Sequence, residues 1–133
     1  MAGDPKPIPY VPEQHYAQVL RWFELFGETI FPEALPPTGL IVPGVAAGFL
    51  YRTDSSMAMI ESLVASKEVS KEERTRAVDA IIVGLSWEAK KLGFKTVLGF
   101  TQLDAVVQRV HRLGWSSMGE GFRLVALQLD TLR

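Results

Sequence analysis

The chain has 133 residues, of which 47% are hydrophobic and 22% are charged. This length fits one compact domain, 1–133, and the composition argues against disorder, so we expect a folded globular protein. The formal net charge of -1 offers no positive field to nucleic acid or to an anionic membrane. No apolar run reaches the roughly 20 residues of a membrane span, and the N-terminus does not resemble a secretory signal. We therefore expect a cytoplasmic protein that binds neither nucleic acid nor membrane.

The residues that usually bind metals are scarce. The sequence has no cysteine and only two histidines, His15 and His111. Thiolate nucleophiles, disulfides and thiolate metal sites are thereby excluded. The two histidines fall in different predicted helices and do not have the spacing of a shared ligand set. We expect no metal site.

Prolines shape the first third of the chain. Residues 1–12 and 32–43 are Pro-rich and are predicted to be largely non-helical. Between them, residues 13–26 carry apolar side chains at helical spacing, and Gly27 follows as a stop signal. One helix is therefore predicted, with an aromatic face that packs on a sheet. A second interpretation is that its loop end borders a substrate cleft.

Three strands are predicted next, over residues 39–42, 45–52 and 57–65. Polar turn formers at 53–56 indicate an antiparallel hairpin between the last two strands. Because side chains alternate along a strand, the third strand is expected to place one set of residues on each face. These sets are Met57, Met59, Glu61 and Leu63 on one face, and Ala58, Ile60, Ser62 and Val64 on the other.

A long helix and a further strand complete a crossover. Ser70 and Glu73 form a capping-box pattern before an apolar stripe that runs to about Leu92, and Gly93 ends the helix. The stripe comprises Val78, Ile81, Ile82, Leu85, Ala89 and Leu92. Residues 95–101 are β-prone, so a parallel strand-helix-strand unit is predicted.

The C-terminal part is predicted to contain a helix from Asp104 to Leu113, stopped by Gly114, and a final strand from Phe122 to Leu129. As an apolar edge strand, the last segment could pair with another subunit in a homodimer. The fold class is α/β (α+β): a mixed sheet, mostly antiparallel, with a central parallel crossover.

Three short segments carry a resemblance to a known family. They are ESLVAS in the third predicted strand, EAKKLGFKTVLGFT from the end of the long helix into the next strand, and HRLGW at the end of the last helix. Their order and spacing resemble the GCN5-related N-acetyltransferase (GNAT) family, over nearly the whole chain. The resemblance implies a GNAT-like fold that binds acetyl-CoA where the fourth and fifth strands part.

The resemblance also implies a set of donor-binding residues. Leu63, Val64 and Ala65 would line the pantetheine arm, and the backbone amides that open the central helix would hold the pyrophosphate. The phosphate contacts would come from Arg74, Thr75, Arg76, Ala77 and Val78. The alternative is that this segment is only a solvated, well-capped start of a helix.

The sequence departs from the family pattern at three positions. Ala77 and Asp79 stand where the family's phosphate loop has glycine or a small residue, and a carboxylate at Asp79 opposes an anionic ligand. Val110 stands where family members often place a tyrosine that protonates the leaving thiolate. His111, one residue later, is turned by about 100 degrees around the helix and is a poor substitute.

Glu61 is the candidate catalytic residue. Transfer of an acetyl group to an amine requires the amine to be neutral, and a carboxylate near the cleft can accept its proton. An apolar setting would raise the pKa of that carboxyl group toward working pH. The alternatives are a glutamate that faces solvent or one that pairs with Arg52 across the hairpin.

Two functions are compatible with these residues. The first is an acetyl-CoA-dependent N-acyltransferase that moves an acetyl group to an amine of a small molecule or protein by direct transfer. The second is a catalytically inactive GNAT-like binding or structural module, since function resides in the site rather than in the fold. An α/β domain unrelated to this family is a third interpretation.

Overall fold

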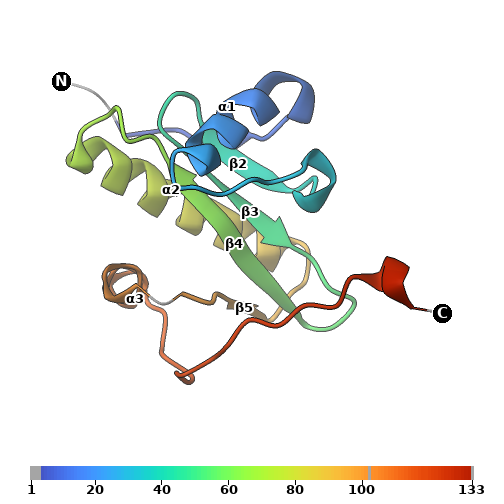
Figure 1. Ribbon diagram of the computed structural model, residues 1–133. Helices are drawn as coiled ribbons and strands as arrows, with labels where there is room; N and C mark the ends of the chain where they lie inside the picture. Colours follow the sequence, from blue (N-terminus) through green and yellow to red (C-terminus); the bar gives the residue numbers. More distant parts are fainter. Residues whose placement is uncertain (1–3, 102, 133) are drawn as a thin grey trace. The chain divides into compact units, whose positions relative to one another are not determined.

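A computed structural model describes residues 4–101 and 103–132. The chain divides into two compact units, Met1–Gln102 and Leu103–Arg133, and each is described separately. The first unit contains a five-stranded sheet in the order β1-β2-β3-β4-β5 (Figure 1). Neighbouring strands are antiparallel except for β4 and β5, which are parallel. The strands are β1 (Ile8–Pro9), β2 (Gly39–Val42), β3 (Ala46–Tyr51), β4 (Met57–Ala65) and β5 (Thr96–Leu98). The predicted mixed sheet with one parallel crossover is confirmed.

Helix α1 (Pro12–Glu24) covers one face of the sheet (Figure 1). Pro12 opens the helix, where the missing N–H of proline costs nothing, and Gly27 lies just past its end with a φ of 78°. Its buried side chains share a core with β2, β3 and β4; that core includes Val19, Trp22, Phe23, Ile41, Ala47, Phe49 and Val64. The predicted helix is confirmed, and its aromatic side chains fill this core.

Helix α2 (Lys71–Lys91) packs on the opposite face of the sheet. The Ser70 hydroxyl accepts a hydrogen bond from the Glu73 amide at 3.1 Å, so the predicted cap is present. The predicted stripe is buried except for Leu92, which lies at the C-cap. At Gly84 the helix approaches β2 so closely that an added Cβ would lie 2.7 Å from the Leu40 side chain.

Strand β4 contains a bulge that the sequence pattern did not reveal. Its register with β3 pairs Phe49 with Glu61 but Ala47 with Val64, so one extra β4 residue lies between these pairs. The backbone accommodates the extra residue at Ser62, whose φ is 58°. An added Cβ on Gly48 would meet the side chains of Leu63 and Ile81, which places Leu63 on the α2 face.

The predicted alternation along β4 is therefore confirmed through Glu61 and wrong beyond it. Directly paired residues of an antiparallel ladder share a face, so Glu61 lies on the α1 face with Phe49, and Val64 lies there with Ala47. Leu63 is on the α2 face, opposite to Glu61 rather than beside it. The bulge is the physical reason, because one inserted residue reverses the facing of every residue after it.

The sheet ends differently from the prediction at both margins. A two-residue strand, β1, pairs with β2 within the Pro-rich N-terminal segment. Strand β5 covers only Thr96–Leu98 of the predicted 95–101. The segment between α1 and β2 adds a short 3-10 turn, η1 (Pro32–Ala34).

The second unit contains α3 (Asp104–Arg112) and a 3-10 turn, η2 (Leu129–Thr131). The predicted helix is confirmed and ends before Gly114, whose φ is 96°. The predicted strand Phe122–Leu129 does not form in the described residues of this unit. Its Leu124 and Val125 are 99% and 87% exposed, and an extended segment becomes a stable strand only where a neighbouring strand and a hydrophobic face support it. Pairing of this segment with a second subunit stays a prediction.

Candidate active site

The edge of β4 that faces β5 opens after three residue pairs. Met57, Ala58 and Met59 pair with β5, and from Ile60 to Ala65 no strand pairs with this edge among the residues that the structure describes. The Ser66 amide donates to the Val45 carbonyl at 2.7 Å, on the β3 side. Because antiparallel ladders alternate, the backbone groups of Ala65 face the open edge. One of the three predicted pantetheine-binding residues thus offers its backbone there.

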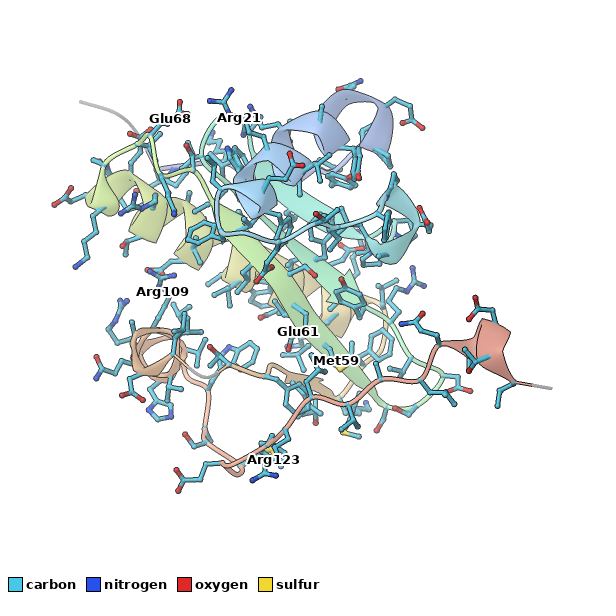
Figure 2. The ribbon with its side chains drawn as sticks, in the orientation of Figure 1. Arg21, Met59, Glu61, Glu68, Arg109 and Arg123 are labelled. Carbon is cyan, nitrogen blue, oxygen red and sulfur yellow. The ribbon has the colours of Figure 1, made fainter. Side chains whose placement is uncertain are left out.

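Glu61 lies at the point where the two strands separate (Figure 2). Its Oε1 accepts a hydrogen bond from the Phe100 amide at 2.6 Å, just beyond the end of β5. Burial raises the pKa of this carboxyl group above its ordinary value, and the hydrogen bond from Phe100 offsets part of that rise. The alternative partner Arg52 lies past the end of β3, whereas the carboxylate is bound to an amide.

Ser62, the residue after Glu61, forms a hydroxyl pair with Tyr51 at the end of β3. The Tyr51 hydroxyl is 2.6 Å from Ser62 Oγ, and it also lies 3.4 Å from the carbonyl oxygen of Ala34, to which it can donate. No motif in the sequence singles out either residue. A positive φ is usually signalled by glycine or asparagine, and Ser62 is neither, so the residue type does not predict the bulge.

The first turn of α2 borders an open hollow of about 670 Å³, lined by Lys71, Glu72, Thr75 and Arg76. Thr75 and Arg76 are two of the predicted phosphate-binding residues. Lys71 and Glu72 are the first residues of the helix, so their amides have no carbonyl partner within it. The hollow therefore combines two cations and two N–H groups with one carboxylate.

The other predicted phosphate contacts are placed differently. Arg74 is half-buried, and its Nη1 donates to the Val69 carbonyl at 3.3 Å. Ala77 and Val78 are buried on the core side of α2. Since the helix begins at Lys71, the amides from Arg74 onward bond to carbonyls of the preceding turn. The expectation that these amides bind a phosphate does not fit this geometry, because they are already engaged, and Thr75 and Arg76 can reach the hollow only through their side chains.

The connector between β4 and α2 is fastened to the end of α1. Lys67 Nζ donates to the Leu25 carbonyl at 3.1 Å and lies 4.2 Å from the centre of the Phe26 ring. Arg21 and Glu68 form an exposed ion pair at 2.6 Å (Figure 2). Lys67 and Glu68 thus contact α1 and its C-terminal loop.

In the second unit, Val110 lies within α3. It occupies the position where the resemblance would place a tyrosine acid. The neighbouring His111 is exposed, with its Nε2 2.8 Å from Ser117 Oγ.

No protein-family model matches the sequence, and no curated protein matches it significantly. Solved structures do match. A protein of Agrobacterium tumefaciens strain C58, provisionally assigned as an acetyltransferase, superposes with a TM-score of 0.68 at 13% identity, over 91% of this chain and 99% of the other. Glucosamine-6-phosphate N-acetyltransferase of Arabidopsis thaliana gives 0.68 at 10% identity, over 90% and 97%. The fold is that of the GNAT acetyltransferases. A structure described as a probable acetyltransferase agrees, with a TM-score of 0.67 at 12% identity over 92% and 99%.

The strands that part beside Glu61 are β4 and β5. In chain order these are the fourth and fifth strands, the pair that the resemblance singled out. Glu61, the backbone of Ala65 and the first turn of α2 all belong to the first unit, around one strand and the helix that follows it.

Proposed function

We propose that this protein is an acetyl-CoA-dependent N-acyltransferase that moves an acetyl group directly to an amine of a small molecule or protein. The observation that carries the proposal is a half-buried carboxylate with a raised pKa at the point where two parallel strands part. Perturbed carboxyl groups of this kind are typical of acid–base sites. The fold, shared with acetyltransferases, supports the same reaction class.

Glu61 would act as the general base. Acetyl-CoA supplies an activated thioester, and the amine must lose a proton before or during attack. The new C–N bond forms as the C–S bond breaks, the amine proton passes to Glu61 directly or through a water molecule, and CoA leaves as the thiolate. The hydrogen bond from the Phe100 amide would keep one carboxylate oxygen fixed, so that Oε2 points to the amine.

The donor would bind along the open edge and the first turn of α2. Leu63, Val64 and Ala65 would line the pantetheine arm, with the Ala65 backbone as the hydrogen-bonding group. Lys71, Thr75 and Arg76 would contact the pyrophosphate, while Arg74, Ala77 and Val78 would shape the start of the helix. Cations and free amides at a helix N-terminus suit an anionic ligand.

The acceptor would be a primary amine. The Arabidopsis neighbour is named for an amino sugar phosphate, and a small amine of that kind is one class to test. A protein amine is the other.

Donor binding is tested by calorimetric titration with acetyl-CoA and with CoA. We expect micromolar affinity, and Arg76→Ala should weaken it about tenfold, as expected for the loss of a charged contact. Arg52→Ala serves as the matched control, because Arg52 is an exposed arginine past the end of β3. No detectable heat at millimolar ligand would overturn the proposal.

The base is tested with Glu61→Gln, which keeps the shape of the side chain and removes its basicity. Turnover should fall by about 10²–10⁴-fold with little change in donor affinity. Glu24→Gln is the control, since Glu24 is exposed at the end of α1. Equal turnover in Glu61→Gln would remove this residue from the mechanism, and binding without turnover on a panel of amines would favour the inactive binding module.

A further inference from the structure

Ser62 has a backbone conformation that its residue type disfavours. Among the residues that the structure describes, it is the only one other than glycine with a positive φ, at 58°. A side chain in this region crowds the backbone, so the conformation persists only where the surroundings hold it. Backbone strain of this kind is concentrated at functional sites, so the contacts that hold Ser62 in this conformation are candidates for a functional role.

Two contacts hold the bulge, one on each face of the sheet. On the α2 face, Leu63 occupies the space over Gly48 that a larger β3 residue would fill. On the α1 face, Ser62 Oγ lies 2.6 Å from the Tyr51 hydroxyl. The same hydroxyl approaches the Ala34 carbonyl in η1, so one phenol joins the end of β3, the bulge and the turn before β2.

The bulge directly follows Glu61, so its position in β4 decides on which side of it Glu61 lies. Glu61 is bonded through its carboxylate to the Phe100 amide, and its peptide group leads directly into Ser62. If Ser62 relaxed to an ordinary strand conformation, the extra residue would have to be absorbed elsewhere in β4, and the facing of the neighbouring residues would change. If the extra residue were absorbed before Glu61 instead, Glu61 would turn to the opposite face of the sheet, so the conformation of Ser62 keeps Glu61 on its present face.

We propose that Tyr51 is a positioning residue: its hydroxyl, held against Ser62 Oγ, fixes the β4 bulge and keeps the Glu61 carboxylate on the Phe100 amide. The catalytic meaning of this role rests on the proposed function. The geometric role does not, so the two can fail separately.

The first measurement is hydrogen exchange of the Phe100 amide by NMR in the full chain, because that amide donates to Glu61. Tyr51→Phe should speed its exchange on the order of tenfold, as for the loss of a hydrogen bond, while the core amides of α2 keep their protection. Tyr16→Phe is the matched control. It removes another tyrosine hydroxyl bond of 2.6 Å, to the Ile30 carbonyl, without touching the bulge. Unchanged Phe100 exchange in Tyr51→Phe would overturn the proposal.

The second measurement asks whether Tyr51 acts through Ser62. Glycine adopts a positive φ without strain, so Ser62→Gly should keep the bulge without needing the hydroxyl pair. Adding Tyr51→Phe to Ser62→Gly should then leave Phe100 exchange unchanged. An equal effect of Tyr51→Phe in both backgrounds would show that it acts by another route, and would overturn the proposal.

The third measurement connects the geometry to turnover. If acetyl transfer is detected, Tyr51→Phe should lower kcat on the order of tenfold while acetyl-CoA affinity is retained, because a misplaced base slows chemistry more than binding. Unchanged kcat in an active enzyme whose Phe100 exchange has changed would contradict the positioning role. Absence of any transfer in the unaltered protein would count against the proposed function, and the exchange experiments would still decide the role of Tyr51.

Discussion

The two edges of β4 contrast sharply. The edge toward β3 is paired from Met59 to Ala65, interrupted only by the bulge, and its neighbours are among the most buried residues of the protein. The edge toward β5 is paired over three residues and then open. One strand thus serves as a core element on one side and leaves polar backbone groups for other partners on the opposite side. Pairing with β3 and burial of that edge hold β4 in place, so β4 stays ordered where β5 no longer pairs with it. A rigid strand of this kind can position a site along its open edge.

The largest effect should come from the closed edge. Phe49 is fully buried and pairs with Glu61 across the strands. Its ring packs edge-on against the Tyr10 ring, with the two ring centres 4.8 Å apart. Phe49→Ala should lower the free energy of unfolding by about 3–5 kcal/mol, measured by urea denaturation. Phe31→Ala is the control, because Phe31 is 63% exposed. Similar losses in the two variants would remove the contrast between core and edge.

The next effect should come from the residue opposite the bulge. A methyl group on Gly48 would lie 2.6 Å from the Leu63 side chain and 2.8 Å from that of Ile81. Gly48→Ala should therefore cost about 1–3 kcal/mol through overpacking, measured in the same denaturation assay. A neutral result would mean that the bulge moves freely, and would weaken the link between the closed edge and Glu61.

A smaller effect concerns the ionisation of Glu61. Its pKa is raised in the folded protein, so the folded state holds this proton more tightly than the unfolded state does. The stabilising contribution is complete below the ordinary glutamate pKa and is lost as pH rises through the raised one. Glu61→Gln should not show this loss. Its free energy of unfolding, relative to that of the unaltered chain, should therefore increase as pH rises from the ordinary glutamate pKa to above the raised one, measured by denaturation at a series of pH values. A difference that stays constant with pH would contradict burial as the cause.

The smallest effect should come from a contact outside both edges. Arg21 and Glu68 form an ion pair whose side chains are 68% and 65% exposed. Arg21→Ala should change stability by less than about 1 kcal/mol, and added salt should erase the difference. A larger loss would show that fastening the β4–α2 connector to α1 supports the open edge.

Most of the fold could be predicted from local patterns. Proline and glycine mark the ends of α1, the Ser70 cap opens α2, and Gly114 follows α3, because these residues act on the backbone nearest to them. The alternation along β4 was predictable only to Glu61. A bulge is a property of two strands together, and Ser62 carries no residue-type signal for it.

The site was predictable in its residue types more than in its contacts. The strand pattern and the family resemblance both led to Glu61, but its partner Phe100 lies 39 residues away. The phosphate contacts stay a prediction; because the Ser70 cap starts α2 at Lys71, the amides of residues 74–78 lie inside the helix. The predicted strand at 122–129 had the composition of a strand, but its side chains are largely exposed, and strand propensity depends on packing against neighbours.

The glycine in the middle of α2 sets the spacing between helix and sheet. Glycine destabilises a helix interior by about 0.5–1 kcal/mol relative to alanine. At Gly84 a methyl group would press on Leu40, so the missing side chain is what lets α2 lie close to β2. Gly84 is also about 20 Å along the helix from Ser70, at 1.5 Å per residue. The middle of α2 is therefore held closely against β2, while Lys71 begins the helix nearly four turns away; the end of the Leu40 side chain would be the first group to move if a methyl group were added at Gly84.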